Sequence, residues 1–531
     1  MSGSFTGTLT GTGTLLRFHL RRDRWLVLWW SVGIALLYWS QAVGIDGLYA
    51  TQAELDAAAQ SMETNTAMIA MAGPARALNT VGGQVTWQAS AFGALAAGLM
   101  SMFVVGRHTR AEEESGRDEL VRAAPVGRLA PVVAALLTAL VANLAVGAAV
   151  TTSLVAYPLA VADSLALGVG VALCGLTFTG TALVAVQLVG STRAAYAIAG
   201  SVLGAAYALR AVGDAGESWI RWLSPIAWYQ SMHPFSGLRW WPALLLLGAA
   251  LLGLGAAAAL LARRDVGSGL LAARPGPAEA GRGLRGPVGL VWRLQRPAVL
   301  GWGLGLFLVG LAYGTIGKDV EELLGDSEFS RELMLAGGAD PVDGFYATAL
   351  LMLALIACGF AISSSLRPRA DEETGRAELL LATALPRRSW WSAHVLVAVG
   401  GALAVLAAAG LGTGVGYAAV TGEWGAVVRY VLPALSYAVG VLLIAALAQL
   451  VVGLAPRLTV LAWLPLLVAV VVMLFGDTLD LPQVVQGLSP FEHLASVPVE
   501  DVAWAPLVVV GLVALGVSSA GQWALRRRDI G

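Results

Sequence analysis

Apolar stretches long enough to cross a lipid bilayer recur along almost the whole chain. A membrane-spanning helix needs about 20 apolar residues, and twelve segments of this chain meet that requirement. They lie near residues 25–44, 85–106, 129–157, 164–189, 194–212, 242–262, 298–316, 344–366, 389–418, 430–453, 458–476 and 505–525. Only 13% of the residues are charged, which is about half the share of a soluble domain. The pattern predicts an all-α polytopic membrane protein with twelve transmembrane helices, and it excludes a soluble enzyme or a nucleic-acid-binding protein.

The distribution of basic residues predicts the orientation of these spans, because cytoplasmic loops are enriched in Lys and Arg. With the N-terminus in the cytoplasm, 26 of the 33 basic residues fall in cytoplasmic segments. The exceptions are Arg76, Arg210, Arg221, Arg239, Lys318, Arg331 and Arg429. An even number of spans then places both termini in the cytoplasm.

The chain contains an internal duplication. Residues 110–120 read RAEEESGRDEL and residues 369–379 read RADEETGRAEL, so that eight of eleven positions are identical. Two shorter motifs repeat in the same order, namely Leu-Ser-Pro at 223–225 and 488–490, and Arg-Arg-Asp at 263–265 and 527–529. Each copy holds six spans, so both copies insert with the same orientation. We therefore expect two six-helix halves related by a pseudo-two-fold axis along the membrane normal.

The same duplication predicts the domain boundaries. Residues 1–24 are expected to form a cytoplasmic N-terminal segment, 25–267 the first half and 291–531 the second half. The intervening segment 268–290 is rich in Pro, Gly and Arg, a composition typical of a linker.

The two repeated loops between spans two and three carry both signs of charge at high density. Each loop has a Glu four residues before an Arg, a spacing that favours ion pairs along a helix. These pairs are Glu113 with Arg117, and Glu372 with Arg376. A short amphipathic helix presented twice, at 110–122 and 369–381, predicts a docking surface for a two-fold partner. The alternative is a charged loop that serves only to orient the spans.

Two glycines interrupt these expected helices at equivalent places, Gly116 and Gly375. Glycine inside a helix costs about 1 kcal/mol relative to alanine. A glycine kept in both copies therefore indicates a break in the helix or a close approach.

The repeated loops resemble those of the permease subunits of ABC-2 type exporters, which read E-x-E-x-G-T/R-x-E-x-L-L. The fused form with two halves is similar to actinobacterial permeases grouped with tetronasin and polyketide antibiotic exporters. The resemblance rests on Glu112, Glu114, Gly116, Arg117, Glu119 and Leu120 in the first loop, and on Asp371, Glu373, Gly375, Arg376, Glu378 and Leu379 in the second. Glu113 and Glu372 lie between the first two acids of each motif and belong to the same candidate site.

The resemblance implies a subunit of an ATP-driven exporter in the bacterial plasma membrane. In that family the loops are coupling helices that dock onto ATP-binding subunits. Two loops imply two copies of a P-loop ATPase as partners, with ATP and Mg²⁺ bound by those partners rather than by this chain. The exported compound would be a hydrophobic or amphipathic antibiotic, drug or lipid-like molecule.

The chain itself cannot form an ATP-binding P-loop, which requires G-x-x-x-x-G-K-[ST]. Its single lysine, Lys318, is followed by Asp319. An ion gradient is the alternative energy source, and a twelve-helix secondary multidrug transporter is the alternative function. Such carriers need ionisable groups inside their spans, and the middles of the twelve predicted spans contain none. A passive scaffold for another membrane complex is also left open.

The expected outer face holds a second group of candidates. Helices are expected at 52–71 and 319–333. Prolines are expected to break helices at matching places after the fifth span of each half, which suggests a gate at the exit. The candidate gate residues are Pro225, Trp228 and Pro490. The alternative is an aromatic belt that anchors the protein at the membrane surface. His233 and His493 have no second ligand at metal spacing, so no metal site is expected.

Overall fold

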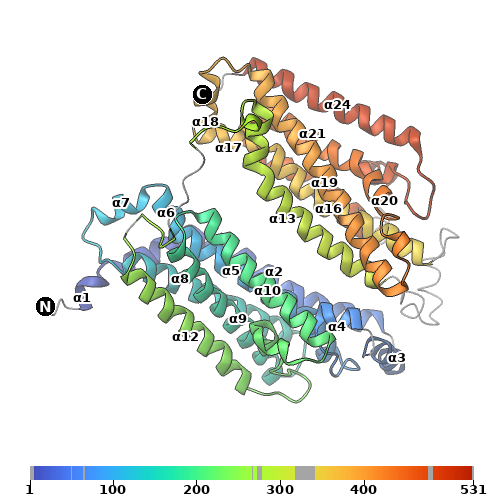
Figure 1. Cartoon of the computed structure of the whole chain (residues 1–531). Coiled ribbons are helices and arrows are strands. Elements are labelled where there is room, and N and C mark those ends of the chain that lie inside the picture. The colour runs from blue at the N-terminus through green and yellow to red at the C-terminus, as the bar shows by residue number, and fades with distance from the viewer. Residues whose placement is uncertain are drawn as a thin grey trace. The chain divides into compact units, whose positions relative to one another are not determined.

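The computed structural model describes residues 5–49, 51–63, 66–265, 267–271, 278–316, 341–475 and 482–528. Twelve helices in this part of the chain are long and apolar enough to cross a membrane, and the described residues form no β-strand. The predicted all-α fold with twelve spans is therefore confirmed. The chain divides into two compact units, 1–276 and 277–531, and each unit contains six of the spans (Figure 1).

The first unit packs its six spanning helices around a core of small and medium apolar side chains. These helices are α2 (Thr12–Leu48), α5 (Val81–His108), α8 (Ala130–Ala156), α9 (Val161–Leu188), α10 (Thr192–Ala215) and α12 (Trp241–Ala262). The helices α5 and α9 are the most buried, because α9 contacts α5, α8, α10 and α12. Glycines permit this close packing: a Cβ on Gly180 of α9 would meet the backbone of Gly253 of α12 at 3.2 Å.

The second unit repeats the arrangement with six spans of its own. They are α13 (Pro287–Ile316), α16 (Pro341–Ser365), α19 (Arg387–Thr421), the pair α20 (Val431–Ser436) and α21 (Ala438–Leu454), the pair η5 (Pro456–Trp463) and α22 (Leu464–Phe475), and α24 (Trp504–Arg527). Helix α16 is the most buried of them. Its core includes Tyr346, Cys358 and Phe360, and both cysteines of the chain, Cys174 and Cys358, are buried and unpaired.

Short helices connect the spans at both ends of the first unit. At one end lie α6 (Arg110–Glu114) and α7 (Arg117–Arg122), and at the opposite end lie α3 (Gln52–Glu63) and α4 (Thr66–Ala72) (Figure 1). We call these the α6–α7 end and the α3–α4 end. The helical segment expected at 52–71 is thus present as α3 and α4, whereas the helix expected at 319–333 lies outside the described residues.

Helix α2 begins at Thr12, although the first span was expected to begin near residue 25. The polar and charged residues of this segment form helix continuous with the span, because some of them pack against the end of α5 and the start of α8. Two of them, His19 and Asp23, are buried. Hydropathy does not detect this extension, since the buried surface is made of polar side chains that pair with one another.

Candidate functional site

The repeated charged loops form two short helices each, joined at a glycine. In the first unit α6 and α7 meet at Gly116, which has φ 71°, and in the second unit α17 (Arg367–Glu373) and α18 (Arg376–Leu381) meet at Gly375, which has φ 69°. A Cβ on either glycine would have open space around it. The left-handed backbone, and not a close approach, therefore requires glycine here. The single helices expected at 110–122 and 369–381 are replaced by this break.

A buried carboxylate fixes the first loop to the end of its own unit. Arg110 Nη1 donates to Glu113 Oε2 at 2.6 Å, and Arg264 Nη2 pairs with Glu113 Oε1. Both arginines also donate to the carbonyl oxygen of Val186, at 2.6 and 3.0 Å. The Arg110 residue is only 1% exposed. We call these three ionic side chains the Arg–Glu–Arg clamp, because they join α6 to the ends of α9 and α12.

The second unit contains the same clamp at equivalent positions. Glu372 accepts from Arg369 Nη1 at 3.2 Å and from Arg528 Nη2 at 2.5 Å. Arg264 and Arg528 belong to the two Arg-Arg-Asp motifs, one at the end of each duplicated copy. The duplicated motif therefore has a structural role, which is to hold the repeated loop.

Two ion pairs that the sequence suggested do not form, Glu113 with Arg117 and Glu372 with Arg376, because both glutamates pair with the clamp arginines instead. Arg117 Nε instead lies 3.0 Å from Glu112 Oε2, and Arg376 Nη1 lies 3.9 Å from an oxygen of Asp371. The left-handed glycine between the expected partners turns the chain, so residues four apart no longer share one helix face. Glu112 also accepts from Arg22 Nη1 of α2, at 2.6 Å.

Four further residues of each loop are exposed to solvent in the same pattern in both units. The exposed residues are Glu114, Arg117, Glu119 and Leu120 in the first loop, and Glu373, Arg376, Glu378 and Leu379 in the second. The two leucines are 76% and 75% exposed, which is unusual for side chains that apolar burial would stabilise. We call each set of four residues a docking face. The structure thus divides the predicted site residues into anchors, glycine joints and docking faces.

A cluster of ionisable residues, which the sequence did not reveal, lies next to the first loop. Asp23 Oδ2 is 2.5 Å from His108 Nε2, and Asp23 Oδ1 is 3.2 Å from Arg107 Nε. The rings of His19 and His108 stack with centroids 3.9 Å apart. The side chains of Asp23 and His108 are fully buried. This cluster was not predicted, because residues 1–24 were expected to form a separate cytoplasmic segment. The four-residue spacing of His19 and Asp23, which places both on one face of a helix, was the only indication in the sequence.

The two candidate gate prolines begin short helices, whereas they were expected to break longer helices. Pro225 is the first residue of α11 (Pro225–Gln230), and Pro490 is the first residue of η6 (Pro490–His493). Each follows a serine of the Leu-Ser-Pro motif whose hydroxyl accepts from a backbone N–H. Proline is favoured at the first position of a helix, because its missing N–H is not needed there. Trp228 Nε1 donates to the carbonyl oxygen of Trp222 at 2.7 Å. A role in gating stays a prediction.

The comparisons with known proteins agree with this architecture. A family model described as the C-terminal domain of the multidrug efflux system permease Rv1217c matches residues 13–261 and 284–526, which lie in the first and second halves of the chain. The chain is also similar to the multidrug efflux system permease protein Rv1217c of Mycobacterium tuberculosis. The two sequences are 37% identical over 529 residues, which cover 98% of this chain and 95% of that protein. With its twelve apolar helices, the chain is a multi-pass protein of the plasma membrane that belongs to this family of multidrug efflux system permeases.

Proposed function

We propose that this chain is the membrane-spanning subunit of an ATP-driven exporter, and that separate ATPase subunits dock on its two docking faces. One observation carries the proposal. Four exposed residues of matching chemistry, Glu-Arg-Glu-Leu, stand in both units beside an equivalent Arg–Glu–Arg clamp. A loop that served only to orient spans would need arginines, but it would need neither exposed leucines nor a rigid base.

The enrichment of basic residues in the sequence around each repeated loop supports a cytoplasmic location for both docking faces, where ATP is available. The single lysine of the chain stands outside any P-loop pattern. The nucleotide and Mg²⁺ would therefore be bound by the partner. Two docking faces call for two ATPase copies per permease.

The polar side chains in the middle of the described spans support a hydrophobic or amphipathic cargo. Asn143 Nδ2 donates to Ser101 Oγ of the neighbouring helix at 2.9 Å, and Ser518 Oγ donates to Gln449 Oε1 at 2.6 Å. Such bonds hold helices together. Asn143 Oδ1 has no hydrogen-bond partner among the described residues, but an isolated amide oxygen does not replace the hydration shell of an ion or a sugar. A compound already dissolved in the bilayer loses less solvation on this path.

The docking proposal is tested by reversing charge on both docking faces at once. Glu119 and Glu378 are exposed and form no ion pair with any other described residue. The double variant Glu119→Lys with Glu378→Lys therefore leaves the clamps intact. It should lose co-purification with a P-loop ATPase that is co-expressed from the same gene cluster, because four units of charge change on the contact surface.

The matched control is Glu279→Lys, which reverses an exposed acid in the segment between the two halves. It should retain the ATPase. Equal recovery of the ATPase with wild type, the double variant and the control would exclude docking through these faces. Loss of the ATPase from both the double variant and the control would do the same.

The alternative is a carrier driven by an ion gradient, and the buried pair of Asp23 and His108 is the observation that favours it. Ionisable groups buried in spans often lie on proton pathways. The discriminating measurement uses purified permease alone in vesicles with an imposed pH gradient. Uptake of a lipophilic dye without any ATPase would support this alternative and reject the ATP-driven function.

A further inference from the structure

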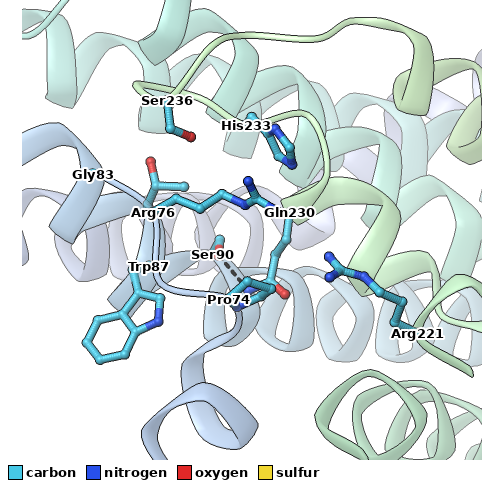
Figure 2. Close-up of a pocket in the computed structure, with 10 residues that line it drawn as sticks. Pro74, Arg76, Gly83, Trp87, Ser90, Arg221, Gln230, His233 and Ser236 are labelled. Carbon is cyan, nitrogen blue, oxygen red and sulfur yellow. Dashed lines mark hydrogen bonds between the residues drawn. The ribbon is translucent and has the colours of Figure 1, made fainter. Parts of the chain in front are cut away.

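A basic pocket lies at the α3–α4 end of the first unit, opposite the end that carries the docking face of this unit. It is formed by the loop before α5, the start of α5, η1 (Trp219–Leu223), α11 and the loop that follows α11. Its cavity of about 20 Å³ has room for roughly one water-sized group, so a larger ligand would insert one atom and otherwise lie at the opening. Figure 2 shows the side chains of Arg76, Arg221 and His233 directed toward one another across this pocket.

The pocket region has more positive charge than nearby carboxylates neutralise. Four arginines gather there, and they are four of the seven basic residues that do not follow the charge rule for cytoplasmic loops: Arg76, Arg210, Arg221 and Arg239. Asp214 lies 3.7 Å from Arg210 Nη1 and 3.2 Å from Arg221 Nη1. Arg76 and Arg239 are exposed and form no ion pair with any residue of the described chain. The excess charge is therefore free to bind an anion.

One hydrogen-bond donor in the same region is unused. Arg221 Nε is buried and has no hydrogen-bond partner among the described residues. Buried polar groups in folded proteins are almost always hydrogen-bonded, so this N–H is available to a bound acceptor. Gln230 and Ser90 also line the pocket, and Gln230 Nε2 donates to Ser90 Oγ at 3.0 Å (Figure 2).

The surrounding loops are held in one shape before any ligand binds. Ala77, His233 and Phe235 have φ between 48° and 56°, a left-handed conformation that non-glycine residues seldom adopt. Two glycines at the start of α5 allow these loops to approach closely, because a Cβ on Gly82 would overlap the Phe235 ring and a Cβ on Gly83 would overlap the Ala77 carbonyl. The site is thus preorganised.

Tryptophans beside the pocket indicate its depth in the membrane. Trp219, Trp222, Trp240 and Trp241 flank the arginines in sequence and are all exposed. The rings of Trp222 and Trp241 stack at 5.5 Å. Exposed tryptophans gather at the level of lipid headgroups, where phosphate groups are abundant. We propose that this pocket binds one oxyanion, the phosphate of an anionic lipid headgroup, through Arg76, Arg221 and His233, which line it, with the charge of Arg239 close by.

The corresponding place in the second unit is built differently. Counting from the shared Leu-Ser-Pro motif, Gln486 and Pro498 replace Arg221 and His233. An apolar groove of about 570 Å³, lined by residues that include Leu443, Pro490 and Val513, lies near that motif. The proposal therefore predicts one phosphate site per chain.

The experiment measures binding of phosphatidylglycerol to the full-length protein in detergent by native mass spectrometry. Phosphatidylcholine and inorganic phosphate are the comparison probes. The test variant is Arg76→Gln with Arg239→Gln, because both side chains are exposed and unpaired and their removal leaves the fold intact. A matched control is Arg429→Gln, an exposed arginine of the second unit that is also predicted to lie outside.

Phosphatidylglycerol should bind wild type in preference to phosphatidylcholine, with one site of high occupancy. The test variant should weaken this binding by roughly thirtyfold, since it removes two arginines and each arginine near a membrane surface adds about 1 kcal/mol. The control should not weaken it, and Arg76→Lys with Arg239→Lys should largely restore it. Displacement of the lipid by millimolar inorganic phosphate would assign the site to a soluble oxyanion. Equal lipid binding by wild type and the Gln variant would overturn the proposal.

Discussion

Glu113 and Arg264 are 151 residues apart in the chain, and their side chains form an ion pair that fixes the first repeated loop to the end of α12. Glu372 and Arg528 form the equivalent pair in the second unit, 156 residues apart. An ion pair conserved between two copies of a duplicated unit shows that the loop and the last span of each half act as one body.

Removal of Glu113 should destabilise the first unit. The substitution Glu113→Ala leaves Arg110 and Arg264 buried without their counter-charge, a situation that costs about 3 kcal/mol. Thermal unfolding in detergent should show a clearly lowered Tm. Glu119→Ala, which removes an exposed acid from the docking face, is the control and should leave the Tm unchanged. A Tm equal to wild type in both variants would show that the clamp does not stabilise the fold.

The left-handed joints should be needed for docking. Alanine at Gly116 and Gly375 raises the energy of the left-handed backbone by roughly 1–2 kcal/mol at each position. We expect Gly116→Ala with Gly375→Ala to reorient α7 and α18 and to weaken binding of the ATPase. Asparagine tolerates this conformation, so Gly116→Asn with Gly375→Asn should retain binding. If alanine and asparagine behave alike, the joints are not required.

The buried Asp23–His108 pair separates the two energy sources. Asp23→Asn keeps the shape of the side chain and removes its charge. In an ATP-driven exporter, this variant should keep ATP-dependent transport in vesicles to within about twofold, provided that the protein remains folded. A carrier driven by protons should lose nearly all gradient-driven uptake. Measuring dye transport with ATP and with a pH gradient therefore distinguishes the two functions.

The stability of the α3–α4 end should decrease in mild acid because of His233. Burial, as the largest cause, and the nearby positive charges of Arg76, Arg239 and Arg221 together lower the pKa of His233 to about 4. In the unfolded chain the pKa is near its ordinary value of 6.5. Between these values the unfolded state binds a proton that the folded state does not, so stability falls as the pH drops from 6.5 toward 4.

The measurement is the Tm at pH 7 and pH 5 for wild type and His233→Gln. The variant should show a smaller decrease in Tm, because it removes one group that takes up a proton on unfolding. A bound anionic lipid should have a similar effect, since a phosphate would favour the protonated imidazole. An identical pH dependence in wild type and variant would exclude a contribution from His233.

The twelve spans could be predicted because a long apolar run has few alternatives to a membrane helix. The segment predicted at 164–189, for example, corresponds to α9 at Val161–Leu188. The break at Gly116 could also be anticipated, since a repeated glycine inside a helical pattern requires a local reason. In both cases the determining interactions lie close together in the sequence.

The Arg–Glu–Arg clamp could not be predicted from spacing. Glu113 has an arginine four residues later, at Arg117, yet its partners are Arg110 and Arg264. The choice depends on where α12 ends in space, which no local pattern contains. The same limit applies to the basic pocket: the sequence marked its arginines as exceptions to the charge rule, but only the folded loops bring them together.

The clamp also constrains where motion can arise during a transport cycle. The first loop is bonded to α2 through Arg22, to α9 through the Val186 carbonyl and to α12 through Arg264. A displacement of this loop is thus transmitted to several helices of the half together, because these bonds limit bending within the loop. Each half then moves as a rigid body, and the hinge for this motion must lie elsewhere along the chain.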